Sequence, residues 1–144
     1  MNKLACSLML VICIYGCSGK HIPPSFSQVS AAGWSTIEVR DDVDYDHAWK
    51  TTLGVIIRDF DIEFADKEYG YIRTSWNHTW SGAYLPGYRV RVTAKFADDH
   101  KTLQVKSEAQ ALKPQEGIWE LGVDTQQLST IKTDLTGTIG RTAR

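Results

Sequence analysis

The stretch Tyr88–Phe96, YRVRVTAKF, alternates between two kinds of side chain. Its even-numbered positions hold Tyr, Val, Val, Ala and Phe, and its odd-numbered positions hold Arg, Arg, Thr and Lys. Because successive side chains of a strand point to opposite faces, this pattern predicts a strand with one buried and one hydrated face. Residues 97–101, ADDHK, then form a turn, and residues 103–109 alternate back. The two segments predict an antiparallel sheet that is covered on one side only.

Upstream of this pair, the periodicity changes from strand to helix and back. Residues 35–40 alternate as a short strand, and Asp41, Asp42 and Asp44 offer N-caps for a helix over residues 45–59. One apolar stripe recurs along that helix at spacings of three and four. Its members are Tyr45, Trp49, Leu53, Ile56 and Phe60. A strand beginning at Ile62, a turn over residues 66–70 and a returning strand over residues 71–76 then predict a hairpin.

Downstream, a short apolar piece over residues 118–123 leads to a second helix. Asp124 with Gln127 three residues later resembles a capping box. Apolar residues follow at helical spacing up to Ile139. The predicted order is β-α-β-β-β-β-α. We therefore expect an α+β fold with an antiparallel four- to five-stranded sheet and helices packed on one face.

This order resembles the helix-grip domains of the BamC family, an accessory lipoprotein of the machinery that assembles outer-membrane β-barrels. The residues that carry the resemblance are DHAW at 46–49, FDIE at 60–63 and the turn glycine Gly70. It covers about residues 35–112 and implies a helix-grip fold and a periplasmic habit of binding proteins. BamC has two such domains and a long N-terminal segment, whereas this chain has one domain, so BamC's role in its complex is not carried over.

The first residues have the features of a secretory signal. Lys3 supplies a positive charge, and the apolar run Leu4–Ile14 is shorter than the roughly 20 residues that a membrane-spanning helix needs. The run ends in Ile14-Tyr15-Gly16-Cys17, which resembles the lipobox of bacterial lipoproteins, with Tyr15 an unusual occupant of the tolerant position. The alternative is that this segment is a buried helix or strand with Cys17 as a core thiol.

The lipobox resemblance implies that the chain is cut before Cys17, which then carries a diacylglycerol and usually an acylated amine. Several acyl chains anchor a protein stably without a membrane-spanning helix. We expect residues 1–16 to be the signal peptide, 17–33 the lipidated terminus with a solvated tether, and 34–144 one α+β domain. Ser18, where inner-membrane lipoproteins commonly have Asp, favours the periplasmic face of the outer membrane over the inner membrane.

Composition excludes several classes of function. All three cysteines lie in residues 1–17, so the predicted domain has no disulfide, zinc finger or cysteine nucleophile. The chain has 16 basic and 17 acidic side chains, and this balance argues against nucleic-acid binding, which needs a concentrated basic footprint. We expect no cofactor, and the oligomeric state is left open.

The sequence shows no strong catalytic or metal-binding motif. The histidines lie at positions 21, 47, 78 and 100, with no pair at the spacing of a helical zinc site. The turn Asp98-Asp99-His100 could bind a metal but suits a hydrated hairpin tip better. The carboxylates of Glu63 and Glu68 could act as an acid–base pair, although hydrated acids are common at strand edges. We expect no metal site and no catalytic residue.

The loop between the hairpin and residue 88 is rich in aromatic residues. Trp80, Tyr84 and Leu85 lie among Gly, Ser and Pro, and exposed loop aromatics are candidate anchors for a protein partner. The alternative is that Trp80 covers the rim of the core. Trp76 and Tyr88 are expected to point into the core at strand ends. A basic row, predicted to be hydrated and offset by Glu108, lies on one sheet face: Arg73, Arg89, Arg91, Lys95 and Lys106.

These observations predict a non-enzymatic envelope lipoprotein whose domain binds another envelope protein or assists assembly. The first alternative is a periplasmic lipoprotein that binds a small apolar ligand, which requires a cavity between the first helix, at Trp49 and Ile56, and the sheet. The second alternative is a hydrolase of envelope polymers, which requires a buried carboxylate pair near Glu63.

Overall fold

The structure is a computed structural model that describes residues 22–141. The predicted signal peptide, the predicted lipidation site Cys17 and residues 142–144 lie outside this range. Among the residues described, no helix combines the length and the apolar character needed to cross a membrane.

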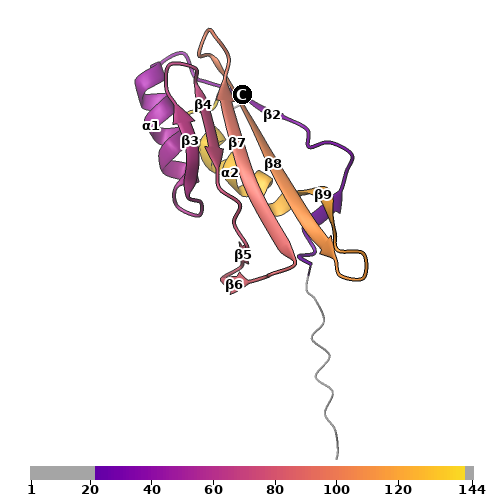
Figure 1. Ribbon diagram of the computed structural model, residues 1–144. Helices are drawn as coiled ribbons and strands as arrows, with labels where there is room; N and C mark the ends of the chain where they lie inside the picture. Colours follow the sequence, from indigo (N-terminus) through magenta and orange to yellow (C-terminus); the bar gives the residue numbers. More distant parts are fainter. Residues whose placement is uncertain (1–21, 142–144) are drawn as a thin grey trace, which may run out of the picture.

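A seven-stranded antiparallel sheet forms the centre of the molecule (Figure 1). Its order is β1-β9-β8-β7-β4-β3. The seventh strand, β2, shares one edge of β8 with β9, and it pairs with the first part of β8 while β9 pairs with the last part of β8. The sheet strands are β1 (Phe26–Gln28), β2 (Ser35–Glu38), β3 (Ile62–Asp66), β4 (Tyr71–Thr74), β7 (Tyr88–Phe96), β8 (Thr102–Lys113) and β9 (Ile118–Asp124). The other elements are a small hairpin of β5 (Thr79–Trp80) and β6 (Ala83–Tyr84), and the helices α1 (Tyr45–Ile56) and α2 (Thr125–Thr138).

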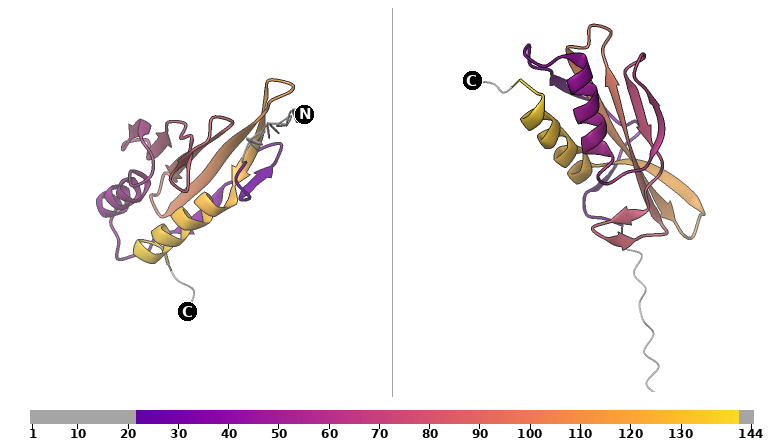
Figure 2. Two further views of the ribbon diagram at one scale, coloured as in Figure 1. Left: turned by 90° about the horizontal axis from the view of Figure 1, so that it is seen from below. Right: turned by 90° about the vertical axis from the view of Figure 1, so that its left-hand side faces the viewer.

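The α+β class and the antiparallel sheet with both helices on one face are confirmed (Figure 2). The sheet is wider than the four to five strands expected, because β1 and β9 extend it beyond β8. The sequence pattern of residues 118–123 predicted only a short apolar piece. This segment forms most of β9, which pairs with β8 from Ala109↔Gly122 to Lys113↔Ile118.

The prediction that residues 17–33 form a solvated tether is wrong for Phe26–Gln28. These residues form β1, which pairs with β9 from Phe26↔Asp124 to Gln28↔Gly122. The pairing leaves the Phe26 ring edge-on to Tyr88, with 6.3 Å between ring centroids. The strand forms because β9 offers an unpaired edge, which residues 20–33 do not reveal by themselves.

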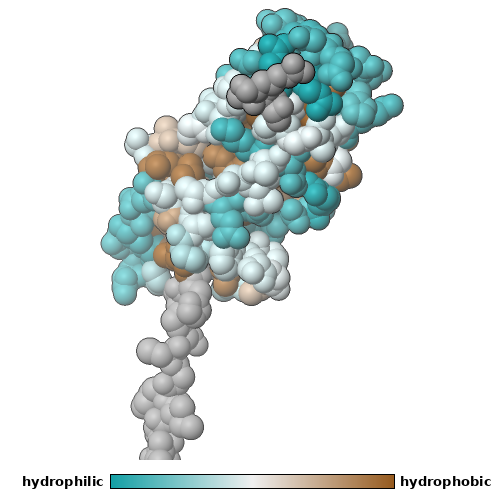
Figure 3. Space-filling view, turned by 180° about the vertical axis from the view of Figure 1, so that it is seen from behind, coloured by the Kyte–Doolittle hydropathy of each residue, from teal (hydrophilic) through white to brown (hydrophobic). Residues whose placement is uncertain are grey.

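The hydrophobic core lies between the sheet and the two helices. The even-numbered side chains of β7 face the helices and are almost fully buried, opposite Leu103, Val105 and Ala109 of β8. Trp49 of α1 packs near Phe96, with 6.4 Å between ring centroids, and Ile56 is fully buried. The side of the molecule that carries the helices has separated hydrophobic spots among hydrophilic residues (Figure 3). One face of the sheet is thus closed by a filled core, and the other is left open.

The N-caps of both helices are confirmed. Asp44 accepts a hydrogen bond from the backbone N–H of His47 at 2.7 Å, and Asp124 accepts one from that of Gln127 at 2.9 Å. Asp124 is fully buried, and its second carboxylate oxygen accepts the hydroxyl of Tyr88. This carboxylate therefore joins β7, the end of β9 and the start of α2.

Candidate interaction face

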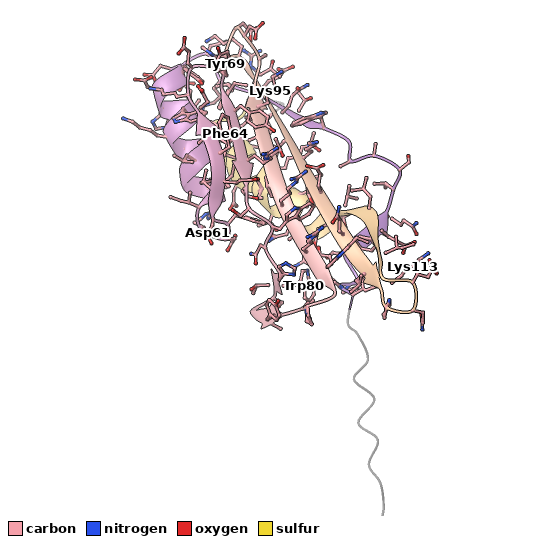
Figure 4. All side chains as sticks on the ribbon, in the orientation of Figure 1. Asp61, Phe64, Tyr69, Trp80, Lys95 and Lys113 are labelled. Carbon is pink, nitrogen blue, oxygen red and sulfur yellow. The ribbon has the colours of Figure 1, made fainter. Side chains whose placement is uncertain are left out.

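The face of the sheet opposite the helices is basic. The register aligns Arg73 of β4 with Thr93 of β7 and Lys106 of β8, and it aligns Arg91 with Glu108. On the three central strands β4, β7 and β8, this open face carries five basic side chains and a single acidic one, Glu108. The basic ones are Arg73, Arg89, Arg91, Lys95 and Lys106. Figure 4 shows nitrogen-bearing side chains along β7 and β8 toward the viewer.

Tryptophans lie against these cations. The Arg89 guanidinium is 4.8 Å from the ring centroid of Trp76 and 4.4 Å from that of Trp119 on β9. Arg91 lies 4.5 Å from Trp76, and the Lys106 ammonium lies 5.0 Å from Trp34, just before β2. Cation–π contacts of this kind hold a guanidinium in a fixed orientation while its N–H groups remain free to donate.

Only part of the positive charge on this face is neutralised within it. Glu108 pairs with Arg91 at 3.1 Å and Lys106 at 3.5 Å, and Glu63 on the bulge of β3 pairs with Arg73 at 3.0 Å. Arg89 donates to the neutral Gln110 side chain at 2.8 Å and 2.6 Å. Lys95 makes no ion pair within residues 22–141. The face keeps an excess of donors suited to an anionic partner.

A hollow of about 600 Å³ adjoins one end of the open face. Phe64 of β3, Tyr71 of β4 and Tyr69 from the turn between β3 and β4 line it, and its charged lining residues are Lys95, Glu68 and Asp98. Phe64 and Tyr69 are 49% and 76% exposed, so apolar and aromatic surface lies directly beside the basic row. Figure 4 shows Tyr69 and Lys95 at the end of the molecule away from Trp80.

The structure separates the three residues predicted to bind a partner. Tyr84 on β6 is 69% exposed and lies beside His78, whereas Trp80 and Leu85 are half-buried and pack against the core. The Trp80 indole N–H donates to the Ser25 hydroxyl at 3.2 Å, which ties this loop to the start of the described chain. Trp80 therefore covers the rim of the core, and Leu85 packs on the core as well. A partner-binding role for any of the three stays a prediction.

The two strand-end aromatics have different positions. Tyr88 is fully buried, as the strand pattern predicted. Trp76 is half-buried on the open face beneath Arg89 and Arg91, so its expected place in the core is wrong. The sequence pattern identifies the basic row but not Trp34 and Trp119. Trp119 reaches the row through the β8–β9 pairing, where it lies opposite Leu112. The alternation of β9 would have placed it there had that strand been predicted.

The acidic residues considered as catalytic do not form a buried pair. Glu63 is exposed and ion-paired with Arg73, and Glu68 lies in the exposed turn after β3. At the other turn, Asp99 accepts the backbone N–H of Lys101 at 2.9 Å, and His100 stacks on Tyr45. Within residues 22–141, no group of three or more His, Cys, Asp or Glu side chains is placed to hold a metal ion.

Comparison of the chain with protein-family models and with curated proteins gives no match. The open face of the sheet, with its cations and indoles, is therefore the candidate functional site on geometry alone.

Proposed function

We propose that this chain is a lipid-anchored envelope protein, held by Cys17, whose domain binds another envelope protein without catalysing a reaction. The observation that carries the proposal is the open sheet face on which Trp34, Trp76 and Trp119 lie against Lys106, Arg89 and Arg91. Tryptophan and arginine are the residues most enriched at the energetic centres of protein interfaces. The lipobox-like sequence and Ser18 support a place on the periplasmic face of the outer membrane.

The filled core favours protein interaction over the small-ligand alternative. Binding of an apolar ligand beneath α1 would require space between that helix and the sheet. Trp49 and Ile56 instead pack in the continuous core with Phe96, and Ile56 is fully buried. The space that an apolar ligand would need is occupied by side chains.

The proposal is tested by affinity capture from crosslinked, detergent-solubilised envelopes, with the full chain tagged at its C-terminus. Wild type is compared with Trp119→Ala, which alters the open face, and with Tyr84→Ala, which alters the exposed loop. We expect one envelope protein to co-purify with wild type and Tyr84→Ala and to be depleted with Trp119→Ala. Circular dichroism confirms that each variant is folded.

Each other result has a definite meaning. If only Tyr84→Ala depleted the captured protein, the adaptor function would stand, and the partner would be bound through the loop over residues 79–85. Absence of any specific protein from the wild-type capture would contradict the adaptor function.

A further inference from the structure

Resting on this proposed function, we propose that the open face binds an extended acidic segment of the partner protein, in which acidic side chains recur at every second position. The segment would lie along β7 with the carboxylates of its inward-facing positions on the basic row, while the side chains of the intervening positions point away from the sheet. The proposal thus assigns the binding site and the chemistry of the partner.

Charge concentration is the first argument. The whole chain has slightly more acidic than basic side chains, yet the open face of β4, β7 and β8 carries five basic residues and only Glu108 as an acid. Glu108 is shared between Arg91 and Lys106. Like charges gathered on one surface raise its potential and draw in a partner of opposite sign.

The spacing of the cations is the second argument. Arg89 and Arg91 are two residues apart on β7, and Lys95 follows on the same face. Side chains two residues apart on a strand are separated by roughly 6.6–6.8 Å. An extended peptide repeats its own side chains at this interval, so acidic residues at alternate positions would match the row.

The state of Arg89 is the third argument. Two indoles and the Gln110 carbonyl oxygen hold its guanidinium, and no carboxylate within residues 22–141 pairs with it. Its Nε–H and one Nη2–H donate to Gln110, so the edge formed by Nη1 and Nη2 remains to donate two parallel N–H groups to a carboxylate. The Arg91–Glu108 pair at 3.1 Å shows a neighbouring arginine with such a partner.

Apolar surface beside the cations favours a peptide over a purely ionic polymer. Trp34 is 43% exposed and Phe64 is 49% exposed, and the hollow beside Phe64 is lined mainly by aromatic side chains, with Lys95 as its basic residue and Glu68 and Asp98 as its acidic ones. A polyphosphate chain would leave these rings uncovered. A peptide can place an aliphatic residue at an inward-facing position beside Phe64 and carboxylates at the other inward-facing positions, and it then uses both kinds of surface.

The test measures binding of the full chain in detergent to a fluorescent peptide that alternates Glu and Val, and to the same peptide with Gln in place of Glu. The variant Lys95→Gln plus Lys106→Gln removes two charges from the open face and leaves the Arg89–indole stack intact. Its matched control is Lys50→Gln plus Lys132→Gln, which removes two charges from exposed positions on α1 and α2. Anionic phosphatidylglycerol vesicles and inorganic polyphosphate serve as competing probes.

We expect the face variant to bind the Glu peptide about tenfold more weakly, because each lost ion pair costs up to about 1 kcal/mol. The control variant should bind the Glu peptide like wild type. Wild type should bind the Gln peptide no more tightly than the face variant binds the Glu peptide. Equal binding of the Glu and Gln peptides, or equal weakening by both double variants, would overturn the proposal. Tighter binding of vesicles or polyphosphate than of the peptide would also overturn it, because the occupant would then be a lipid surface or a phosphate polymer.

This result is separable from the capture experiment. A captured partner that survives Lys95→Gln plus Lys106→Gln would contradict the acidic-segment inference and leave the adaptor function standing. An empty wild-type capture would contradict the adaptor function itself.

Discussion

Asp124 is a buried carboxylate with several partners. One oxygen accepts the Gln127 N–H at 2.9 Å, the other accepts the Tyr88 hydroxyl, and its own N–H donates to Ser107 Oγ at 3.1 Å. We predict that Asp124→Ala lowers the free energy of unfolding by about 2–4 kcal/mol, because it removes an N-cap and leaves a buried hydroxyl unpaired. Urea denaturation followed by tryptophan fluorescence measures the loss.

The control for this prediction is Asp98→Ala, in the exposed turn after β7. Its free energy of unfolding should stay within about 0.5 kcal/mol of wild type, as for most surface substitutions. A similar loss for both variants would show that the Asp124 effect comes from total charge and not from the buried network.

Tyr88 makes stability depend on alkaline pH. Burial, the hydrogen bond to Asp124 and the nearby carboxylate charge together raise the pKa of Tyr88 above its ordinary value of 10.0. The unfolded chain therefore loses this proton at a lower pH than the folded chain does. The stabilisation is complete below pH of about 10 and declines as pH rises further, with a slope of up to about 1.4 kcal/mol per pH unit.

We predict that Tyr88→Phe flattens this alkaline decline, although its stability at neutral pH is lower because Asp124 loses a donor. Tyr69→Phe, at a position 76% exposed, should keep the wild-type slope. Urea denaturation at a series of pH values from neutral to strongly alkaline supplies both slopes. Parallel curves for wild type and Tyr88→Phe would exclude Tyr88 as the source of the decline.

At the scale of elements, β1 docks where β9 has no side chain. A Cβ atom on Gly122 would lie 2.2 Å from Phe26 Cε2 and 2.6 Å from the Ser27 carbonyl oxygen, too close for either contact. We predict that Gly122→Ala lowers the free energy of unfolding by about 1–3 kcal/mol, since a packed site must shift. Amide hydrogen exchange in residues 26–28 should accelerate, because β1 is displaced first.

Gly54→Ala is the matched control for this substitution. Gly54 is exposed on α1, and a Cβ there would meet no atom within 4 Å. Replacing a helical glycine with alanine should raise the free energy of unfolding by about 0.4–1 kcal/mol. If the amide hydrogens of β1 exchanged at the wild-type rate in the Gly122→Ala variant, the docking argument would be contradicted.

The elements predictable from the sequence were those whose pattern is local. The alternation over residues 88–96 gave β7 with its observed bounds, and Asp44 and Asp124 marked the starts of both helices. β1 was missed because its pairing joins residues about a hundred positions apart, such as Phe26 and Asp124. Such non-local pairing leaves no periodic signal in a three-residue strand.

The candidate site was predictable only in part, for the same reason. The basic row could be placed on one face, because two-residue spacing fixes which side chains share a surface. Its aromatic component could not, since Trp34 and Trp119 join it from β2 and β9 through the fold. Trp76 lies outside the core that the strand pattern predicts for it, because it packs against two arginines on the open face.

At the scale of the whole molecule, the early start of β1 limits how far the domain can lie from an anchor at Cys17. Residues 18–25 span at most about 30 Å when fully extended. With the proposed anchor and the proposed partner, the acidic segment would have to lie close to the same membrane. Confinement to one surface raises the effective concentration of the two proteins and strengthens a weak, charge-dependent contact.

We therefore predict a specific result when residues 1–17 are replaced by a cleavable signal that ends in a non-lipidated site. The protein should move from the membrane to the soluble periplasmic fraction, and crosslinked capture of the partner should fall by about tenfold or more. Binding of the purified protein to the Glu–Val peptide should not change, because the open face is intact. Quantitative immunoblots of fractionated cells and of the captured material measure both effects. Undiminished capture with the released domain would show that the face binds tightly enough without the anchor, and it would remove the membrane from the recognition step.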